Sequence, residues 1–280
     1  MIKQGVIAFV AILLFQPGSF ALPQSTTQAS AKQKVIADLK EMALAGDVKS
    51  EVQLGLAYAT GDGVGKDDAV AVRWLRKAAD QDNPVAERFL AEMYFKGRGV
   101  PADNAEAAKW LRLAAEQGDA QSQHNLAVLY TQGLGVPRNL KEAVKWMGKS
   151  AEQGLAAGQV GLGIFYENGE GVPEDSLEAV KWYRMAVAQN DPSGMNNLAR
   201  LLATSKSASI RNPQEAISLA MKAVAAANNP DYLDTLAAAY FAAGDRDKAI
   251  EAEQKALAMN PANDFYKESL QKYLGTSGGH

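Results

Sequence analysis

The sequence predicts an all-α protein, a right-handed α-solenoid of stacked antiparallel helix pairs. The first observation is a block of fourteen residues, GLGVPRNLKEAVKW at 133–146, which recurs at 97–110 and 169–182 and, in a looser copy, at 61–74. Each copy begins 36 residues after the one before it. The second observation is that apolar residues between the blocks follow helical spacing. The third is that Gly, Asp and Asn stand where such helices would end and begin. Repeats of roughly 20–50 residues are typical of solenoids, because one helix pair cannot bury its own apolar face.

The first helix of each unit is expected to end at a repeated tyrosine. In the stretch AQSQHNLAVLYTQG, Leu126, Leu129 and Tyr130 fall on one helical face. A Gly-x-Gly turn then ends the helix, because glycine readily adopts the left-handed backbone found at helix C-termini. The structural repeat positions of this half are Tyr58, Tyr94, Tyr130 and Tyr166, then Gly61, Gly97, Gly133 and Gly169, then Gly63, Gly99, Gly135 and Gly171.

The second helix of each unit is expected to begin at an Asp or Asn cap and to carry a tryptophan. The caps are Asp67, Asp103, Asn139 and Asp175. In three units a glutamate follows three residues later, which predicts a capping box: Glu106, Glu142 and Glu178. Every tryptophan of the chain falls at one repeat position: Trp74, Trp110, Trp146 and Trp182. We interpret the repeat tyrosines and tryptophans as core residues that fill the space between units.

The N-terminus has the pattern of a secretory signal peptide. Lys3 precedes an apolar run from Val6 to Phe15, and small residues flank Phe20 before a cleavage site near Ala21. The alternative is a membrane anchor, but the run is about half of the ~20 residues that a spanning helix needs. We therefore expect residues 1–21 to be removed, residues 22–33 to form a flexible leader, and the mature chain to have no membrane span. The product would be exported, either periplasmic or secreted.

These motifs resemble the Sel-one-like repeat, a relative of the tetratricopeptide repeat. LGLAYATGDGV (54–64) and LGIFYENGEGV (162–172) match the family pattern closely. The resemblance implies full copies at about 48–83, 84–119, 120–155 and 156–191, within a Sel-one-like part spanning 34–204.

The pattern changes after residue 190. Leu202 stands where the repeat tyrosine should be, and neither the Gly-x-Gly-Val turn nor the tryptophan follows. The stretch PDYLDTLAAAYFAAGDRDKAIEAEQKALAMNP (230–261) resembles a true tetratricopeptide repeat, although Glu253 stands where an aromatic residue is commoner. We assign residues 205–274 to a tetratricopeptide-like part with a closing helix, and residues 275–280 to a frayed tail.

Composition excludes several kinds of chemistry. The chain has 280 residues, a formal net charge of −3 and no cysteine. The charge gives no reason to expect nucleic acid binding. The absence of cysteine excludes disulfides, thiolate zinc sites and cysteine nucleophiles.

The remaining candidates for chemistry have simpler interpretations. His124 could be a ligand or a catalyst, but we expect it to be solvated or to face a groove. Asp67 and Asp68 are explained by a helix start, so no metal site or cofactor is expected. Ser269 and Lys272 match the S-x-x-K motif of penicillin-recognising enzymes without its companion motifs.

Three further sets could contact a partner. The basic residue before each tryptophan (Arg73, Lys109, Lys145, Lys181) forms either a solvated face or a basic stripe. Three aromatic residues outside the repeat positions could be surface anchors or could simply pack: Phe95, Tyr183 and Tyr232. The middle residue of the Gly-x-Gly turn varies between copies: Asp62, Arg98, Leu134 and Glu170.

A repeat fold with no catalytic constellation suggests an exported, non-enzymatic scaffold. It would bind a protein or peptide in a concave groove, as an adaptor or regulator of an envelope complex or signalling pathway. Such roles, and secreted factors that act on host proteins, are what the family resemblance implies. There are three alternatives to the adaptor role. The protein could be a secreted factor that acts on host proteins, a cell-wall or β-lactam-interacting enzyme that uses Ser269, or a structural subunit that self-associates through its ends.

Overall fold

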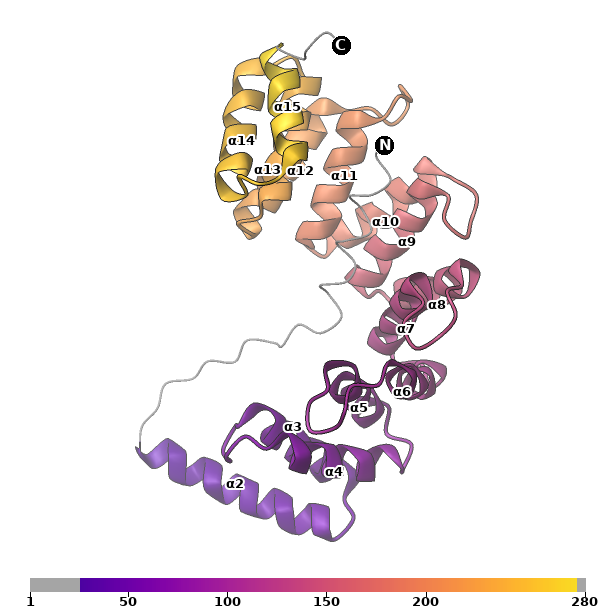
Figure 1. Ribbon diagram of the computed structural model, residues 1–280, viewed down its shortest axis with the longest axis vertical. Helices are drawn as coiled ribbons and strands as arrows, with labels where there is room; N and C mark the ends of the chain where they lie inside the picture. The colour runs from indigo at the N-terminus through magenta and orange to yellow at the C-terminus, as the bar shows by residue number, and fades with distance from the viewer. Residues whose placement is uncertain (1–25, 276–280) are drawn as a thin grey trace. The chain divides into compact units, whose positions relative to one another are not determined.

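The computed structural model describes residues 26–275, and all regular secondary structure in that range is helical. After α2 (Thr26–Leu44), first helices alternate with second helices (Figure 1). The first helices are α3 (Val48–Thr60), α5 (Pro84–Lys96), α7 (Ala120–Gln132), α9 (Ala156–Asn168), α11 (Pro192–Thr204) and α13 (Pro230–Ala242). The second helices are α4 (Asp68–Ala79), α6 (Asn104–Glu116), α8 (Leu140–Glu152), α10 (Ser176–Ala188), α12 (Pro213–Ala226) and α14 (Arg246–Met259). The last helix is α15 (Asp264–Leu274).

The chain divides into two compact units, residues 1–150 and 151–280. In the first unit, α3 packs on α4 and α5 on α6, and the second helix of each pair packs on the first helix of the next. In the second unit, α9 packs on α10, α11 on α12 and α13 on α14, and α15 closes the series against α14. Each unit is therefore a stack of helix pairs, which confirms the predicted all-α repeat fold.

The expectation of a flexible leader over 22–33 is wrong for its second half. Helix α2 begins at Thr26, and its residue Lys32 forms an ion pair of 2.5 Å with Asp62 in the first Gly-x-Gly turn. Ile36 of the same helix lies against Gly63. The helix therefore packs against the first turn of the stack and against α3. The proposed signal peptide and residues 276–280 of the tail lie outside the described residues.

The predicted N-caps are confirmed, but the predicted capping boxes are wrong. Asp67, Asp103 and Asp175 accept hydrogen bonds from backbone N–H groups of the helices that follow, as does Asn139. The backbone N–H of each cap donates instead to the carbonyl of the repeat tyrosine before it, at 2.9 Å from Asp103 to Tyr94. The glutamate side chains form ion pairs with lysines on the same helix: Glu106 with Lys109, Glu142 with Lys145 and Glu178 with Lys181.

The two glycines of each Gly-x-Gly turn have different structural roles. The first ends the helix in the left-handed conformation, as Gly97 does with φ of 64°. The second also has positive φ, and it lies against the preceding repeat: a Cβ on Gly99 would overlap the carbonyl of Asp68. The repeated glycine pair therefore closes one helix and seats the turn on the repeat before it.

The repeat aromatic residues are less uniformly buried than predicted. Trp110 and Trp146 are each 6 % exposed, whereas Trp74, Trp182 and all four repeat tyrosines are half-buried. The fully buried repeat positions are alanines in the first turn of the second helices: Ala71, Ala107, Ala143 and Ala179. A small side chain there lets the two helices of a pair approach closely, and the aromatic rings cover the resulting contact.

A second periodic feature, which was not predicted from the sequence, is a buried polar pair inside three of the repeats. Gln117 donates to both carboxylate oxygens of Glu87, at 3.0 and 2.9 Å, and Glu87 is 1 % exposed. Equivalent bonds of 2.8 Å join Gln81 to Glu51 and Gln189 to Gln159. The same 36-residue spacing would have revealed these positions. They tie the end of α4, α6 and α10 to the first helix of the same repeat.

Candidate binding site

A surface pocket opens in the second unit where the repeat pattern lapses. The segment that joins α11 to α12, residues 205–212, replaces the Gly-x-Gly-Val turn and is one residue longer than the turn at 169–175. Leu202 stands in the tyrosine position, and its carbonyl accepts the cap N–H of Asn212 at 2.9 Å, as Tyr94 does for Asp103. The backbone framework of the repeat is thus kept while its turn and its aromatic ring are lost.

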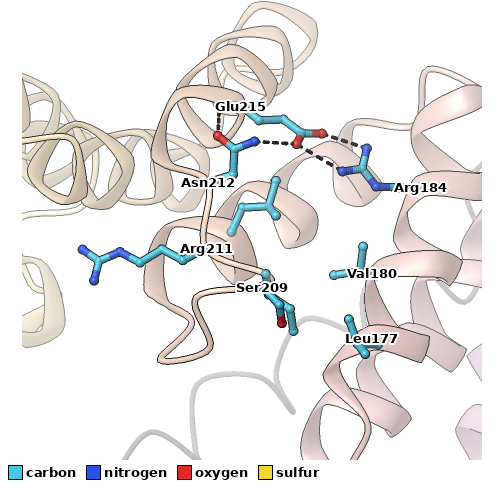
Figure 2. A pocket seen from close by; sticks show the side chains of 9 residues that line it. Leu177, Val180, Arg184, Ser209, Arg211, Asn212 and Glu215 are labelled. Carbon is cyan, nitrogen blue, oxygen red and sulfur yellow. Dashed lines mark hydrogen bonds and ion pairs between the residues drawn. The ribbon is translucent and has the colours of Figure 1, made fainter.

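The walls of this pocket are apolar and come from three parts of the chain. Leu177 and Val180 project from α10, Leu202 from the end of α11, and Ile210 from the connecting segment. The cavity measures about 230 Å³, and Leu177 beside it is 62 % exposed. Figure 2 shows Leu177 and Val180 facing the connecting segment across the open space. An exposed leucine at the mouth of a cavity is a feature that a bound apolar group would cover.

The rim of the pocket is polar and already organised. Arg184 of α10 contacts both carboxylate oxygens of Glu215 of α12, at 2.8 and 3.1 Å. Asn212 donates to Glu215 at 3.1 Å and caps α12 (Figure 2). Arg211 is exposed and extends away from Arg184. The pocket therefore combines apolar walls with one donor and one acceptor held in place, as ligand sites commonly do.

His124 is buried, which corrects the expectation of a solvated or groove-facing side chain. It is 3 % exposed, and neither ring nitrogen has a hydrogen-bond partner. Burial lowers the pKa of His124 to about 4, so the ring is neutral near pH 7. Val52 and Val160 stand at the equivalent places of two other repeats. His124 thus occupies a packing position.

The other chemical candidates are placed in structural roles. Asp67 caps α4, and Asp68 pairs with Arg98 at 2.5 Å. In residues 26–275, no group of three acidic or histidine side chains is arranged to hold a metal ion. Lys272 of the S-x-x-K match lies over the rings of Phe241 and Tyr273, at 5.4 and 6.0 Å from their centroids. Lys272 therefore has a packing role in the fold.

The candidate partner-contacting sets also have contacts within the protein. The lysines before the tryptophans lie over the indole rings, at 5.3 Å for Lys109 and 5.6 Å for Lys145. Tyr183 and Tyr232 are buried, whereas Phe95 is half-buried. Arg98, one of the variable turn residues, also bonds the carbonyl of Ala59 at 2.6 Å. These contacts lie within and between repeats.

A buried acidic pair at the C-terminal end was not predicted. Glu253 of α14 is 0 % exposed, and its carboxyl group faces that of Asp234 on α13. Burial and the charge of Asp234 raise its pKa, and burial also raises the pKa of Asp234. Glu253 is the residue that departs from the tetratricopeptide pattern, so the departure itself was the available signal.

The described helices offer no route across a membrane, since none combines enough length with enough apolar character. The fold and the pocket together define a class: a helical-hairpin repeat protein with a small surface pocket at a break in its pattern. The family model of the Sel1 repeat matches residues 48–83, 84–119, 120–155, 156–191 and 192–228. The chain belongs to the Sel1 repeat family. The fifth match crosses the boundary between residues 204 and 205 that the sequence analysis expected.

Solved structures agree with this assignment. A Sel1 repeat protein from Oxalobacter formigenes is 28 % identical, with a TM-score of 0.71, and the match covers 84 % of this chain and 97 % of that one. The protein c5321, a protective antigen of uropathogenic Escherichia coli with an SLR fold, is 29 % identical with a TM-score of 0.56, over 86 % of this chain and 60 % of that one. The Cut9–Hcn1 structure of the APC/C shares only the fold, at 15 % identity and a TM-score of 0.63, over 88 % of this chain and 46 % of that one. No curated protein matches the sequence.

Proposed function

We propose that this protein is an exported, non-enzymatic repeat scaffold that binds a segment of a partner protein, as an adaptor or regulator of an envelope complex or signalling pathway. The pocket formed by α10, residues 205–212 and α12 is part of its binding surface. We propose this pocket, instead of the concave groove expected from the sequence, as the contact with the partner. The observation that carries the proposal is an open, apolar-walled cavity with a paired arginine and glutamate at its rim.

The chemistry of the site supports binding over catalysis. The rim holds charged groups that are paired with each other, and the walls offer aliphatic side chains without a nucleophile beside a base. Sel1 repeat proteins of this type are generally scaffolds for protein contacts. The β-lactam alternative depends on Ser269, which lies on α15 and is not one of the residues that line the pocket.

The binding proposal is tested by photo-crosslinking in the host. The photoreactive residue p-benzoylphenylalanine replaces Ser209 at the pocket in a C-terminally tagged chain. A matched protein carries it at Lys255, an exposed position on α14. We expect a discrete crosslinked protein from position 209 that is absent from position 255. Identical adducts at both positions, or none from a folded and abundant protein, would contradict the proposal.

Export is tested separately, on the mature N-terminus. We expect the purified protein to begin at or near Leu22, because cleavage is predicted after about Ala21. A variant with Ala21→Arg should accumulate uncleaved, since small residues are required at the cleavage site. Recovery of an intact N-terminus from the cytoplasm would show that the chain is not exported.

A further inference from the structure

The pocket lies where other repeats place a tyrosine ring. In two repeats of the first unit, an arginine of a second helix pairs with the repeat tyrosine eighteen residues later. Arg112 donates to the hydroxyl of Tyr130 at 2.7 Å, and its Cζ lies 5.9 Å from the ring centroid. Arg76 donates to the hydroxyl of Tyr94 in the same way, with its Cζ 5.5 Å from the ring centroid.

The fourth repeat keeps the arginine, but the fifth repeat lacks the tyrosine that would pair with it. Arg184 stands eighteen residues before Leu202, and both line the pocket. Leucine supplies neither the outer part of a ring nor a hydroxyl group. Arg184 pairs with Glu215 instead. The pocket therefore lies beside the repeat position where this chain places a tyrosine in four other repeats.

We infer that the pocket binds a tyrosine side chain of the partner segment, with the phenol ring against Leu177, Val180 and Ile210 and the hydroxyl at Arg184 and Glu215. This inference rests on the proposed function and names the chemistry of the partner.

Size and polarity agree with this occupant. The cavity of about 230 Å³ exceeds the ~150 Å³ of an apolar cavity that accommodates benzene. Arg184 is 52 % exposed in its ion pair, and such exposed pairs hold their partners weakly. Arg184 can therefore donate to the phenol oxygen while Glu215 accepts the phenol proton. A hydroxyl-lacking ring would leave both groups without this contact, which favours tyrosine over phenylalanine.

The test uses the folded mature chain and N-acetyl-tyrosinamide as the probe. Methyl NMR spectra of the protein, labelled at Ile, Leu and Val, report on Leu177, Val180, Leu202 and Ile210 directly. We expect saturable shifts at these methyl groups, with N-acetyl-phenylalaninamide binding roughly three- to tenfold more weakly because one hydrogen bond is lost. N-acetyl-leucinamide should bind more weakly still.

Two variants and one matched control complete the test. Leu202→Tyr restores the repeat residue, so it should fill the pocket, abolish saturable binding and leave the melting temperature equal or higher. Leu177→Asp changes an exposed residue at the mouth and should weaken binding at least about tenfold, since it places a charge beside the ring. Leu274→Asp alters another exposed leucine, 47 % exposed and far along the chain on α15, and should leave binding unchanged.

Each contrary result has a defined meaning. Shifts scattered over the surface, shifts retained in Leu202→Tyr and Leu177→Asp, or no shift at the probe's solubility limit would each overturn the inference. A wild-type dimer that Leu202→Tyr dissociates would show that a second copy fills the pocket, and would also overturn it. In the crosslinking experiment, a partner that is captured equally by wild type and Leu202→Tyr keeps the scaffold function and removes the tyrosine pocket. Capture by neither protein removes the scaffold function itself.

Discussion

The backbone of Gly135 lies directly against the carbonyl group of Asn104, so closely that a Cβ on Gly135 would overlap it. Asn104 is the first residue of α6 and belongs to the preceding repeat. Gly99 lies against Asp68 in the same way one repeat earlier. The second glycine of the turn is thus required by packing between repeats, in addition to its positive φ of 69°.

Replacing this glycine should separate the steric cost from the conformational cost. Gly135→Ala is expected to lower the free energy of unfolding by about 3 kcal/mol or more, because it adds overpacking to a strained left-handed backbone. Gly118→Ala is the matched control: its φ is 95°, but nothing lies within 4 Å of the added Cβ. That variant should cost only about 1–2 kcal/mol. Equal losses in urea unfolding would show that the contact with Asn104 is unimportant.

Truncating the repeat tryptophans should affect stability according to their burial. Trp146 is 6 % exposed, so Trp146→Ala should cost about 3–5 kcal/mol, the range for large-to-small core changes. Trp182 is half-buried, and Trp182→Ala should cost less. Chemical denaturation followed by circular dichroism measures both. A Trp146→Ala protein that unfolds like wild type would disprove the core role of that residue.

The hydroxyl of Tyr130 should contribute through its arginine. Tyr130→Phe removes the bond from Arg112 and is expected to cost about 1 kcal/mol, the usual net contribution of one hydrogen bond. Tyr166→Phe provides the control, because the residue eighteen positions before Tyr166 is Gly148, which has no side chain to donate. This change should be nearly neutral in the same denaturation assay. A cost of the same size in both variants would argue against the arginine pairing.

His124 should make the first unit sensitive to acid. Burial holds the pKa of His124 at about 4, below the ~6.5 of an unfolded chain, so the unfolded state binds the proton more tightly. Stability is therefore complete above about pH 6.5 and falls as the pH drops towards 4, by up to about 3 kcal/mol. His124→Val, which places the residue found at two equivalent positions, should remove this part of the pH dependence.

The comparison with His124→Val is needed because burial of Glu87 acts in the opposite direction. Desolvation raises the pKa of Glu87 to about 7, which favours the folded state at low pH. Only the difference between wild type and variant isolates the histidine. If that difference is constant from pH 4 to pH 7, His124 does not titrate as inferred.

The acidic pair at the C-terminal end should give the second unit an alkaline sensitivity. The pKa of Glu253 is raised by burial and by Asp234, so the folded state holds the proton more tightly than the unfolded state does. Its contribution is full below the unfolded pKa of ~4.3 and is lost as the pH rises through the folded pKa. Glu253→Gln stays neutral and should raise the melting temperature at pH 8 more than at pH 5. The exposed Glu251→Gln on the same helix should leave both values nearly unchanged.

Repetition made most of the fold predictable. Helix ends, N-caps and the order of helix pairs depend on local chemistry, and the 36-residue spacing presents that chemistry several times over. The hydrogen-bond partners of individual side chains were harder to predict. Glu106 is positioned for a capping box, yet the cap N–H reaches the Tyr94 carbonyl first, because the turn folds back onto the end of the preceding helix. Glu106 then bonds the indole N–H of Trp110 at 3.1 Å.

The candidate site could be anticipated only in part. The loss of tyrosine at Leu202 and the altered turn are visible in the sequence, but a leucine in place of a tyrosine is compatible with a filled core as well as with a cavity. Which outcome occurs depends on whether residues 205–212 close over α10. These residues leave Leu177 exposed. The path of this longer connecting segment therefore determines whether a cavity remains.

The sequence by itself determined that this protein is a stack of helix pairs, since each repeat carries its own start, stop and apolar face. Only the tertiary structure decided which repeated residues are buried, because burial depends on the neighbouring repeat. It placed the alanines in the contact between paired helices, set Tyr94 and Tyr130 beside arginines, and left one arginine beside an open pocket. Those outcomes follow from distances between residues far apart in the chain, which spacing along the sequence does not specify.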